Sequence, residues 1–232
     1  MEVDILAFGA HPDDVELGCG GTIIKEIQNG KKVGIIDLTR GELGTRGNAD
    51  TRDSESKLAA NILNISFREN MNFKDGFFLN DESHKIEIVK KIRKYRPKIV
   101  LANAISDRHP DHARGAQLII DSCFLSGLEK INTNQNIFRP KAIYHYIQFN
   151  NLIPDFLIDI SEYMDLKIKS IKQYKTQFYN PLSKEKETII SSQDFFDSIT
   201  YRAKDLGRQS NCKFAEGFIA NQKIQPVSLF DI

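Results

Sequence analysis

The sequence has few cysteines, no long apolar run and almost no net charge, and each absence excludes a class of protein. Its three cysteines, Cys19, Cys123 and Cys212, are far apart and form no CxxC pair. We therefore expect free thiols in a reducing compartment and no disulfide framework. No stretch approaches the roughly 18 apolar residues that cross a bilayer, and the start "MEVDILAFG" lacks the basic segment of a signal peptide. These absences predict a cytoplasmic protein that is not embedded in a membrane.

The charge balance argues against broad electrostatic binding. The 232 residues include 32 Lys and Arg against 31 Asp and Glu, which leaves a formal net charge of +1 at pH 7. Proteins that capture nucleic acid or anionic membranes carry a clear basic excess, so we expect neither partner. The length suits one domain, residues 1–232, with a core large enough to fold without disulfides.

Strand-like apolar runs alternate with helical patterns along the chain. The expected strands are 5–8, 33–38, 99–102, 142–147 and 156–161; the expected helices are 15–29, 52–63, 84–95, 111–124, 161–177 and 193–206. The polar segments 125–140 and 179–188 are expected to be loops. Strands and helices that alternate over short links predict an α/β domain with a mainly parallel sheet.

Polar loops follow three of the expected strands. They read "GAHPDD", "TRGELGTRGNADTR" and "NAISDRHPDH". Ligands of parallel sheets bind outside the carboxyl ends of the strands. We therefore expect these loops to converge on one edge of the sheet, and the active site to lie there.

Two short histidine motifs lie in the first and third of these loops. His11 and Asp14 are three residues apart in "HPDD", as are His109 and His112 in "HPDH". A catalytic zinc takes three protein ligands and leaves one position for water, so we predict a metal site made of His11, Asp14 and His112. Zn²⁺ is expected, with Fe²⁺ and Co²⁺ as alternatives for nitrogen and oxygen ligands. The competing interpretation is that each His-Pro-Asp is only a turn that caps the next helix.

Two further residues of these motifs are candidates for proton transfer. Adjacent side chains do not easily reach one ion, so Asp13 would face the substrate and take a proton from water, whose pKa a metal lowers from about 15.7 toward about 7. Asp13 as a cap of the following helix is an alternative that is compatible with catalysis. Beside a metal and Asp111, His109 is expected to favour its protonated form and to donate to an oxyanion or a leaving amine. The alternatives for His109 are a fourth ligand and an ordinary loop histidine.

Four arginines fall in or beside the same loops: Arg40, Arg46, Arg52 and Arg108. A guanidinium pairs with a carboxylate through two parallel hydrogen bonds that lysine does not reproduce. A local cationic wall in a neutral protein predicts a small anionic substrate, bound by Arg46, Arg52 and Arg108. The alternative is pairing with surface carboxylates, which for Arg40 is as good an interpretation.

The glycines of the second loop raise the question of a nucleotide site. Gly41, Gly44 and Gly47 form neither GxGxxG nor GxxxxGK[ST], and they follow the second strand instead of the first. A nucleotide-binding module whose histidines hold no metal therefore stays only as the non-enzymatic alternative. Gly18, Gly20 and Gly21 are better explained by close packing of the first helix on the sheet.

At these motifs the sequence resembles the LmbE-like metal-dependent deacetylases, a superfamily that includes N-acetylglucosaminyl-phosphatidylinositol de-N-acetylase. "AHPDD" and "HPDH" carry the likeness, and "LTRGELGTRG", "TRDSE", "DRHPDHARGA" and "FAEGF" are similar to the bacillithiol-biosynthesis branch. That branch removes acetate from N-acetylglucosaminyl-malate. The resemblance covers about residues 4–220.

The resemblance implies a Rossmann-like three-layer fold, zinc on His11, Asp14 and His112, and Asp13 as the general base. It also implies that His109 acts on the tetrahedral intermediate or the amine, that Asp111 orients His109, and that Arg139 lies near the base. The implied partner is a small anionic N-acetylglucosamine conjugate, bound by a homo-oligomer. The same chemistry on another N-acetylated sugar, such as a chitooligosaccharide, is the enzymatic alternative.

Overall fold

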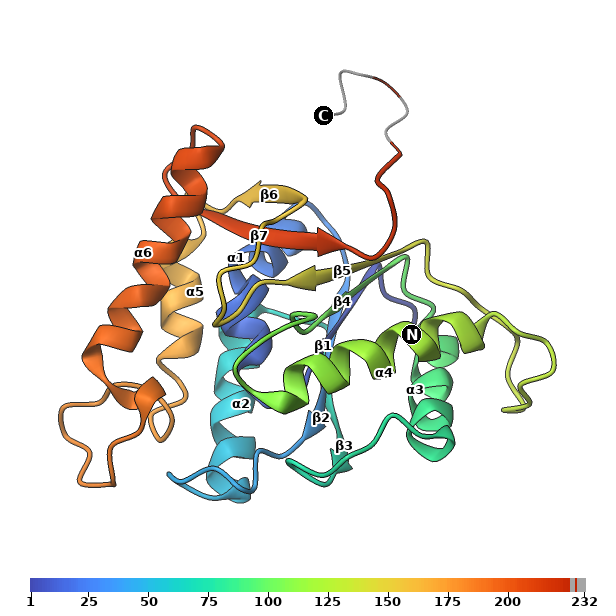
Figure 1. Cartoon of the computed structure of the whole chain (residues 1–232), viewed down its shortest axis with the longest axis horizontal. Coiled ribbons are helices and arrows are strands. Elements are labelled where there is room, and N and C mark those ends of the chain that lie inside the picture. The colour runs from blue at the N-terminus through green and yellow to red at the C-terminus, as the bar shows by residue number, and fades with distance from the viewer. Residues whose placement is uncertain (226–227, 229–232) are drawn as a thin grey trace.

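Seven strands form one mixed sheet in the computed structural model, which describes residues 1–225 and 228 (Figure 1). The strands are β1 (Ile5–Gly9), β2 (Val33–Thr39), β3 (Phe67–Phe73), β4 (Ile99–Ala102), β5 (Ala142–Tyr146), β6 (Phe156–Asp159) and β7 (Ala215–Ala220). Their order is β3-β2-β1-β4-β5-β7-β6. The first five are parallel, and β7 runs antiparallel to both β5 and β6. The expected α/β fold with a mainly parallel sheet is confirmed.

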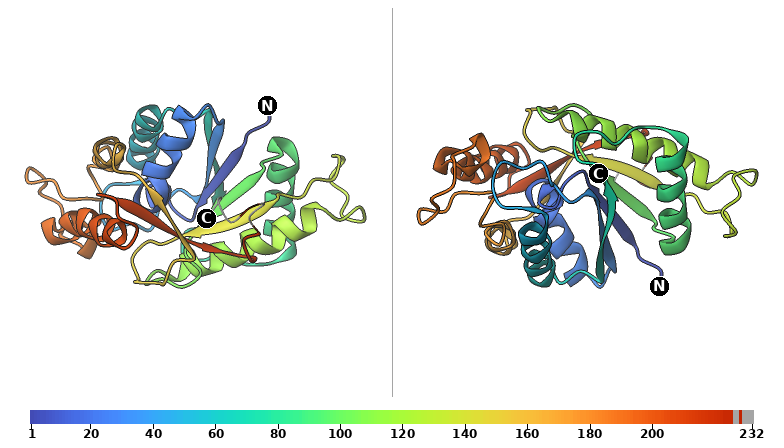
Figure 2. Two further views of the ribbon diagram at one scale, coloured as in Figure 1. Left: turned by 90° about the horizontal axis from the view of Figure 1, so that it is seen from above. Right: turned by 90° about the horizontal axis from the view of Figure 1, so that it is seen from below.

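Helices cover both faces of the sheet. They are α1 (Asp14–Gln28), α2 (Ala49–Leu63), α3 (Glu82–Tyr95), α4 (Pro110–Ser126), α5 (Met164–Ile171), α6 (Gln193–Gln209) and the 3₁₀ turn η1 (Ile189–Ser191). Figure 2 shows α1 and α2 on one side of the sheet and α3 and α4 on the other. None of the helices in residues 1–225 has the length and apolar character needed to cross a bilayer.

Two apolar clusters, one on each face, explain why β1 is a continuous apolar run. Leu6 and Phe8 pack toward α3 and α4, while Ile5 and Ala7 pack toward α1. A strand that is buried on both faces has no polar side to alternate with. A third cluster attaches α6 to α5 and to the buried ring of Tyr174.

Two strands and one helix differ most from the expectations. β3 and β7 were not expected; β3, with the sequence "FRENMNF", is a half-buried edge strand whose polar residues hide the strand pattern. The expected helix over 161–177 is shorter, because α5 ends at Ile171 and is followed by turns that bury Tyr174 and Phe178. Tertiary burial, not helical periodicity, accounts for the apolar residues of that segment.

Hydrogen bonds fix the loop after β1 between the ends of its two neighbours. The carbonyl of Ala10 accepts from the backbone N–H of Thr39 (3.0 Å) and from its hydroxyl (2.9 Å). The N–H of Ala10 donates to Oδ1 of Asn103, just after β4, over 2.8 Å. The "HPDD" segment therefore leaves the sheet in a defined direction.

Helix α1 is bent at Cys19, and a buried carboxylate stabilises the bend. Cys19 has φ −145° and ψ 19°, outside the helical range. Glu216 of β7 accepts from the N–H groups of Gly21 (3.0 Å) and Thr22 (2.7 Å) and pairs with Lys167 at 2.5 Å. These bonds satisfy backbone donors that the bend exposes. A Cβ atom at Gly18 would overlap the Tyr146 ring, which confirms close packing there.

Candidate metal centre and active site

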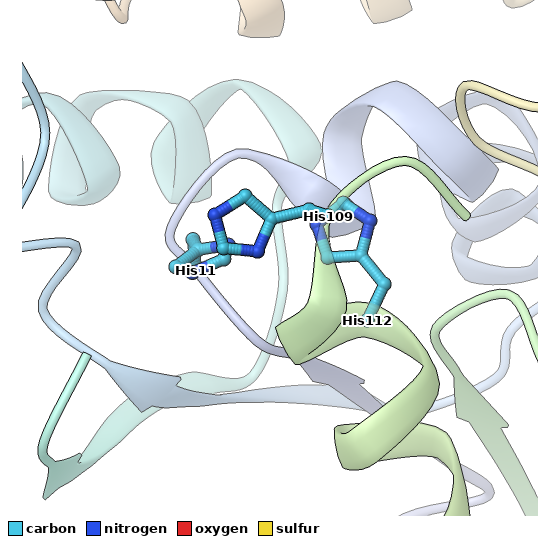
Figure 3. A group of neighbouring side chains, drawn as sticks. All are labelled: His11, His109 and His112. Atoms are coloured by element: carbon cyan, nitrogen blue, oxygen red, sulfur yellow. The ribbon is translucent and has the colours of Figure 1, made fainter. Parts of the chain in front are cut away.

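Three histidines from two loops meet at the carboxyl edge of the sheet (Figure 3). The ring centroid of His11 lies 4.6 Å from that of His109 and 5.6 Å from that of His112. His109 is the N-cap of α4 and Pro110 follows at its first position, so His112 lies one turn away on the same helix start. One ring nitrogen from each histidine lies within 4.8 Å of the others, a spacing that suits a shared metal ion.

Asp14 lies between two of these imidazoles. Its Oδ1 is 3.1 Å from Nε2 of His112, and its Oδ2 is 3.6 Å from Nδ1 of His11. The side-chain amides of Gln148 and Asn103 donate to Oδ1 and Oδ2 over 2.8 and 2.9 Å. Burial opposes ionisation of Asp14, but the attraction of His112 and the contact with His11 outweigh it and hold its pKa well below the ordinary value. The structure thus brings the three predicted ligands together.

Two more carboxylates face the other nitrogen of His11. Nε2 of His11 lies 3.0 Å from Oδ1 of Asp75 and 3.5 Å from Oδ2 of Asp111. These three buried residues form a second candidate metal-binding group, with ligand atoms within 4.8 Å of one another. Burial disfavours protonation of His11, but hydrogen bonds to Asp111, Asp14 and Asp75 raise its pKa well above the ordinary value.

The residues of this centre fit a divalent cation. Three carboxylates, Asp14, Asp75 and Asp111, surround one imidazole in a buried space, where a divalent cation would lower the cost of burying their charge. Within the part of the chain that the structure describes, Nδ1 of the buried His112 has no hydrogen-bond partner, and it faces Oδ2 of Asp107 at 3.6 Å. A carboxylate behind the second nitrogen of a histidine is typical of metal ligands. The nitrogen and oxygen donors are those that Zn²⁺ and similar divalent ions bind.

Asp13 is buried beside this centre in a strained conformation. Its φ of 122° is rare for a residue with a side chain, and such strain is often found at functional sites. Its carboxylate makes no capping bond to α1, so the capping alternative is not what the structure has. Burial, opposed by Arg52, raises the pKa of Asp13 to about 7. A carboxyl with that pKa exchanges protons readily at neutral pH.

Arg52 is engaged with the candidate base. Its Nη2 donates to Oδ2 of Asp13 over 2.6 Å, and Nε and Nη2 donate to the Pro12 carbonyl over 3.1 and 3.0 Å. Its Nη1 donates to Oε1 of Gln177 over 2.8 Å. Substrate binding by Arg52, which also lines the site cavity, stays a prediction; in the structure its donors hold the "HPDD" loop.

The contacts of His109 and Asp111 differ in part from those expected. The carboxylate of Asp111 accepts from the Gly76 N–H (2.8 Å) and from Arg114 (2.6 Å), not from His109. The backbone N–H of Asp111 donates to Nδ1 of His109 over 3.3 Å. Burial and the nearby His11 lower the pKa of His109, so here the neutral form is favoured, contrary to expectation.

The remaining predicted arginines divide between the cavity and the surface. Arg46 is buried, donates to the Ser183 hydroxyl over 2.6 Å and lines the site cavity. Arg108 lines the same cavity with its guanidinium 5.0 Å from the Phe149 ring centroid. Arg40 follows the alternative interpretation, since it pairs with surface Asp50 at 2.7 Å and with Asp53.

Arg139 lies away from the site in this chain, which corrects its expected place beside Asp13. Its Nη2 donates to the Phe124 carbonyl over 2.9 Å, and its guanidinium covers the Phe124 ring. It lines a separate cavity with Lys141 and Ile143. The last carbonyls of α4 have no hydrogen-bond partner within the helix, and they attract this cation.

Several site residues were missed from the sequence. Asn103 and Gln148 directly follow strands β4 and β5, a position that by itself signals a role at this edge. Asp75 follows β3, a strand that was not predicted because its sequence is rich in polar residues. Gln177, which reaches Arg52 from the turns after α5, has no signal in the sequence.

A cavity of about 450 Å³ opens beside the metal centre. Its polar lining includes His11, Asp13, Asp14, His109 and His112. Its apolar lining comes mainly from Phe149, η1 and α6, with Phe195, Ile199 and Leu206. The site therefore combines a polar reaction centre with a long apolar flank. Clefts of this kind and size hold small-molecule ligands.

Comparisons with known proteins show the family to which the chain belongs. The family model described as GlcNAc-PI de-N-acetylase (PIG-L) matches residues 6–123. Diacetylchitobiose deacetylase of Thermococcus kodakarensis is 31% identical over 186 residues, 75% of this chain and 70% of that protein. The conserved protein TT1542 of Thermus thermophilus superposes with a TM-score of 0.89 at 30% identity, over 98% of each chain. The N,N'-diacetylchitobiose deacetylase of Pyrococcus horikoshii has the same fold: TM-score 0.80, 24% identity, 97% of this chain and 87% of that one.

Proposed function

Because this chain belongs to the PIG-L family of metal-dependent deacetylases, we propose that it removes the acetyl group of N-acetylglucosaminyl-malate by hydrolysis. The observation that carries the proposal is the buried Asp13–Arg52 pair beside the centre of His11, Asp14 and His112. A base of near-neutral pKa and a candidate divalent metal site share one cavity, an arrangement suited to hydrolysis of an unactivated amide.

His11, Asp14 and His112 are proposed to hold the metal, with Zn²⁺ as the ion. When bound, such an ion polarises a carbonyl and makes water more acidic. Asp75 and Asp111 are then the carboxylates behind Nε2 of His11 and fix its ring. The two amides on Asp14 keep its oxygens in place.

Asp13 is proposed to carry the proton through the reaction. Its carboxylate takes a proton from the attacking water as the new C–O bond forms at the acetamide carbon. It then gives that proton to the sugar nitrogen as the C–N bond breaks, so acetate and a free amine leave. Arg52 holds the carboxylate in position during both transfers.

His109 is proposed to stabilise the oxyanion as a neutral imidazole. Since its Nδ1 accepts the Asp111 N–H, Nε2 carries the hydrogen and is the donor. A preorganised donor of this kind acts on the charge that develops at the carbonyl oxygen. Protonation of the amine by His109 is less suitable, because burial lowers its pKa.

The malate conjugate is proposed as substrate on two grounds. The "HPDDVELGCGGT" and "DRHPDHARGA" segments resemble the branch that acts on it, and Arg108 provides positive charge in the cavity, which Arg46, paired with Glu185, also lines. We also propose that the protein is a homo-oligomer in the cytoplasm. Light scattering, which measures the mass of the assembly, tests the oligomeric state.

Deacetylation of N,N'-diacetylchitobiose is the second candidate. It is supported by the 31% identity to the Thermococcus enzyme and by a cavity large enough for more than one sugar ring. Comparing kcat/KM on the two substrates separates the candidates.

The test of the mechanism is turnover by the native protein and by Asp13→Asn, with metal content measured on both. We expect equal metal content and a loss of kcat of about 10²-fold or more, the usual contribution of a general base. Asp53→Asn, on the surface of α2, is the matched control. Near-normal turnover by Asp13→Asn would remove the proposed proton carrier.

A further inference from the structure

Five cations line the cavity within the described residues, and their partners divide them into two groups. Arg46, Arg52 and Lys167 are paired with the carboxylates of Glu185, Asp13 and Glu216. The other two, Arg108 and Arg202, form no ion pair with a carboxylate in residues 1–225. A cation that lines a cavity without a carboxylate partner is available to a ligand.

Arg202 is the less expected of these two cations. It lies on α6, three residues after the buried Ile199, and reaches across to the loop after β5. Its Nη2 donates to the Phe149 carbonyl over 2.7 Å, a bond that fixes the direction of the guanidinium. The half-buried guanidinium has four more N–H donors, none of which donates to a side-chain acceptor among residues 1–225.

Arg108 and Arg202 flank the same residue. The Arg108 guanidinium lies 5.0 Å from the Phe149 ring centroid, while Arg202 holds the Phe149 backbone. The Phe149 ring also stacks on Phe195 of α6, with centroids 6.1 Å apart. One residue, Phe149, thus contacts both guanidinium groups beside α6, Arg108 through its ring and Arg202 through its backbone carbonyl.

Asp107 is the carboxylate of this region, and its oxygens are used elsewhere. They accept from the backbone N–H groups of Phe149 (2.9 Å) and Arg108 (2.5 Å), and they face Nδ1 of His112 at 3.6 Å. Asp107 therefore supports the metal centre and does not neutralise the two arginines by direct pairing.

We propose that Arg202, together with Arg108, binds the carboxylate groups of the substrate's aglycone and makes this end of the cavity its anionic subsite. The inference rests on the deacetylase function proposed above and assigns the specificity to a residue on α6. Guanidinium groups pair with carboxylates in a planar, two-point manner. Arg52 is not part of this subsite, because it pairs with Asp13 and donates to the Pro12 carbonyl.

The test compares native protein, Arg202→Gln and Arg208→Gln on two substrates, N-acetylglucosaminyl-malate and the neutral N,N'-diacetylchitobiose. Glutamine keeps one donor for the Phe149 carbonyl, and Arg208 is an exposed arginine on the same helix that pairs with Asp205. We expect Arg202→Gln to lower kcat/KM for the malate conjugate about 10- to 100-fold, mainly through KM. We expect Arg202→Gln to leave kcat/KM for N,N'-diacetylchitobiose unchanged, and Arg208→Gln to leave kcat/KM for both substrates unchanged.

Three outcomes would overturn the subsite: equal losses on both substrates, no loss on the malate conjugate, or a native enzyme that turns over only chitobiose. In the last case the deacetylase function survives. If the native enzyme turns over neither substrate, that result contradicts the proposed function and not the subsite. Calorimetric binding of N-acetylglucosaminyl-malate to native protein and Arg202→Gln then still decides the subsite, because equal affinities refute it. Arg202→Lys, with thermal melting of each variant, controls for misfolding.

Discussion

Replacing Arg68 with methionine should be among the most destabilising single changes in this protein. Arg68 of β3 donates to both oxygens of Asp37 over 2.7 and 2.9 Å and to Oε1 of Glu16 over 2.6 Å. All three side chains are at least nine-tenths buried. Methionine fills a similar space but leaves two buried carboxylates without a cation. Removing one partner of a buried ion pair costs about 3–5 kcal/mol.

The assay is urea unfolding, followed by thermal melting. For a chain of this length about 1 kcal/mol corresponds to roughly 2–4 °C in Tm, so we expect Tm to fall by about 6–20 °C. The triple variant Arg68→Met, Asp37→Asn, Glu16→Gln should recover much of the loss, since it removes the stranded charges.

The loss should also depend on pH. Burial already raises the pKa of Asp37, with Arg68 opposing, so removing Arg68 raises it further. The folded variant then binds more protons than the unfolded chain, and its stability falls as pH rises. The difference from native protein should therefore be larger at pH 8 than at pH 5. A loss below about 1 kcal/mol, or one independent of pH, would refute the reasoning about buried charge.

Three other changes test the site and the packing. Arg52→Gln should raise the pKa of Asp13 further, which shifts the acid limb of the kcat/KM profile to higher pH by about 1–2 units; an unmoved limb contradicts the pairing. Gly18→Ala should cost about 1–3 kcal/mol in urea unfolding because its Cβ meets the Tyr146 ring. Gly20→Ala, whose nearest neighbour atom is 3.6 Å away, should be neutral or stabilising. Dialysis against a chelator should abolish turnover and lower Tm, with both restored by Zn²⁺; turnover that persists in metal-free protein refutes the metal centre.

Much of the fold was predictable because its signals are local. The apolar runs of β1, β2 and β4 and the glycine and proline boundaries of the helices mark the elements directly. β3 and β7 were not found, because an edge strand with polar residues and a short late strand resemble loops until their partners are known. Because these strands were not predicted, Asp75 after β3 and the bonds of Glu216 to the bend in α1 were not predicted either.

The candidate metal residues were predictable for a similar reason. His11 and Asp14, and His109 and His112, stand at fixed spacing at strand and helix ends, and parallel strands bring such ends to one edge. The partners of the charged residues were not predictable in this way.

The sequence by itself determined the alternation of elements and the two histidine motifs, since periodicity and spacing are properties of neighbouring residues. Only the tertiary structure decided that Arg52 pairs with Asp13, that Arg139 lies at the end of α4, and that Arg202 faces the cavity. The physical reason is that a charge is compensated by whichever group packing brings within a few ångströms of it. That distance depends on contacts between residues far apart in the chain.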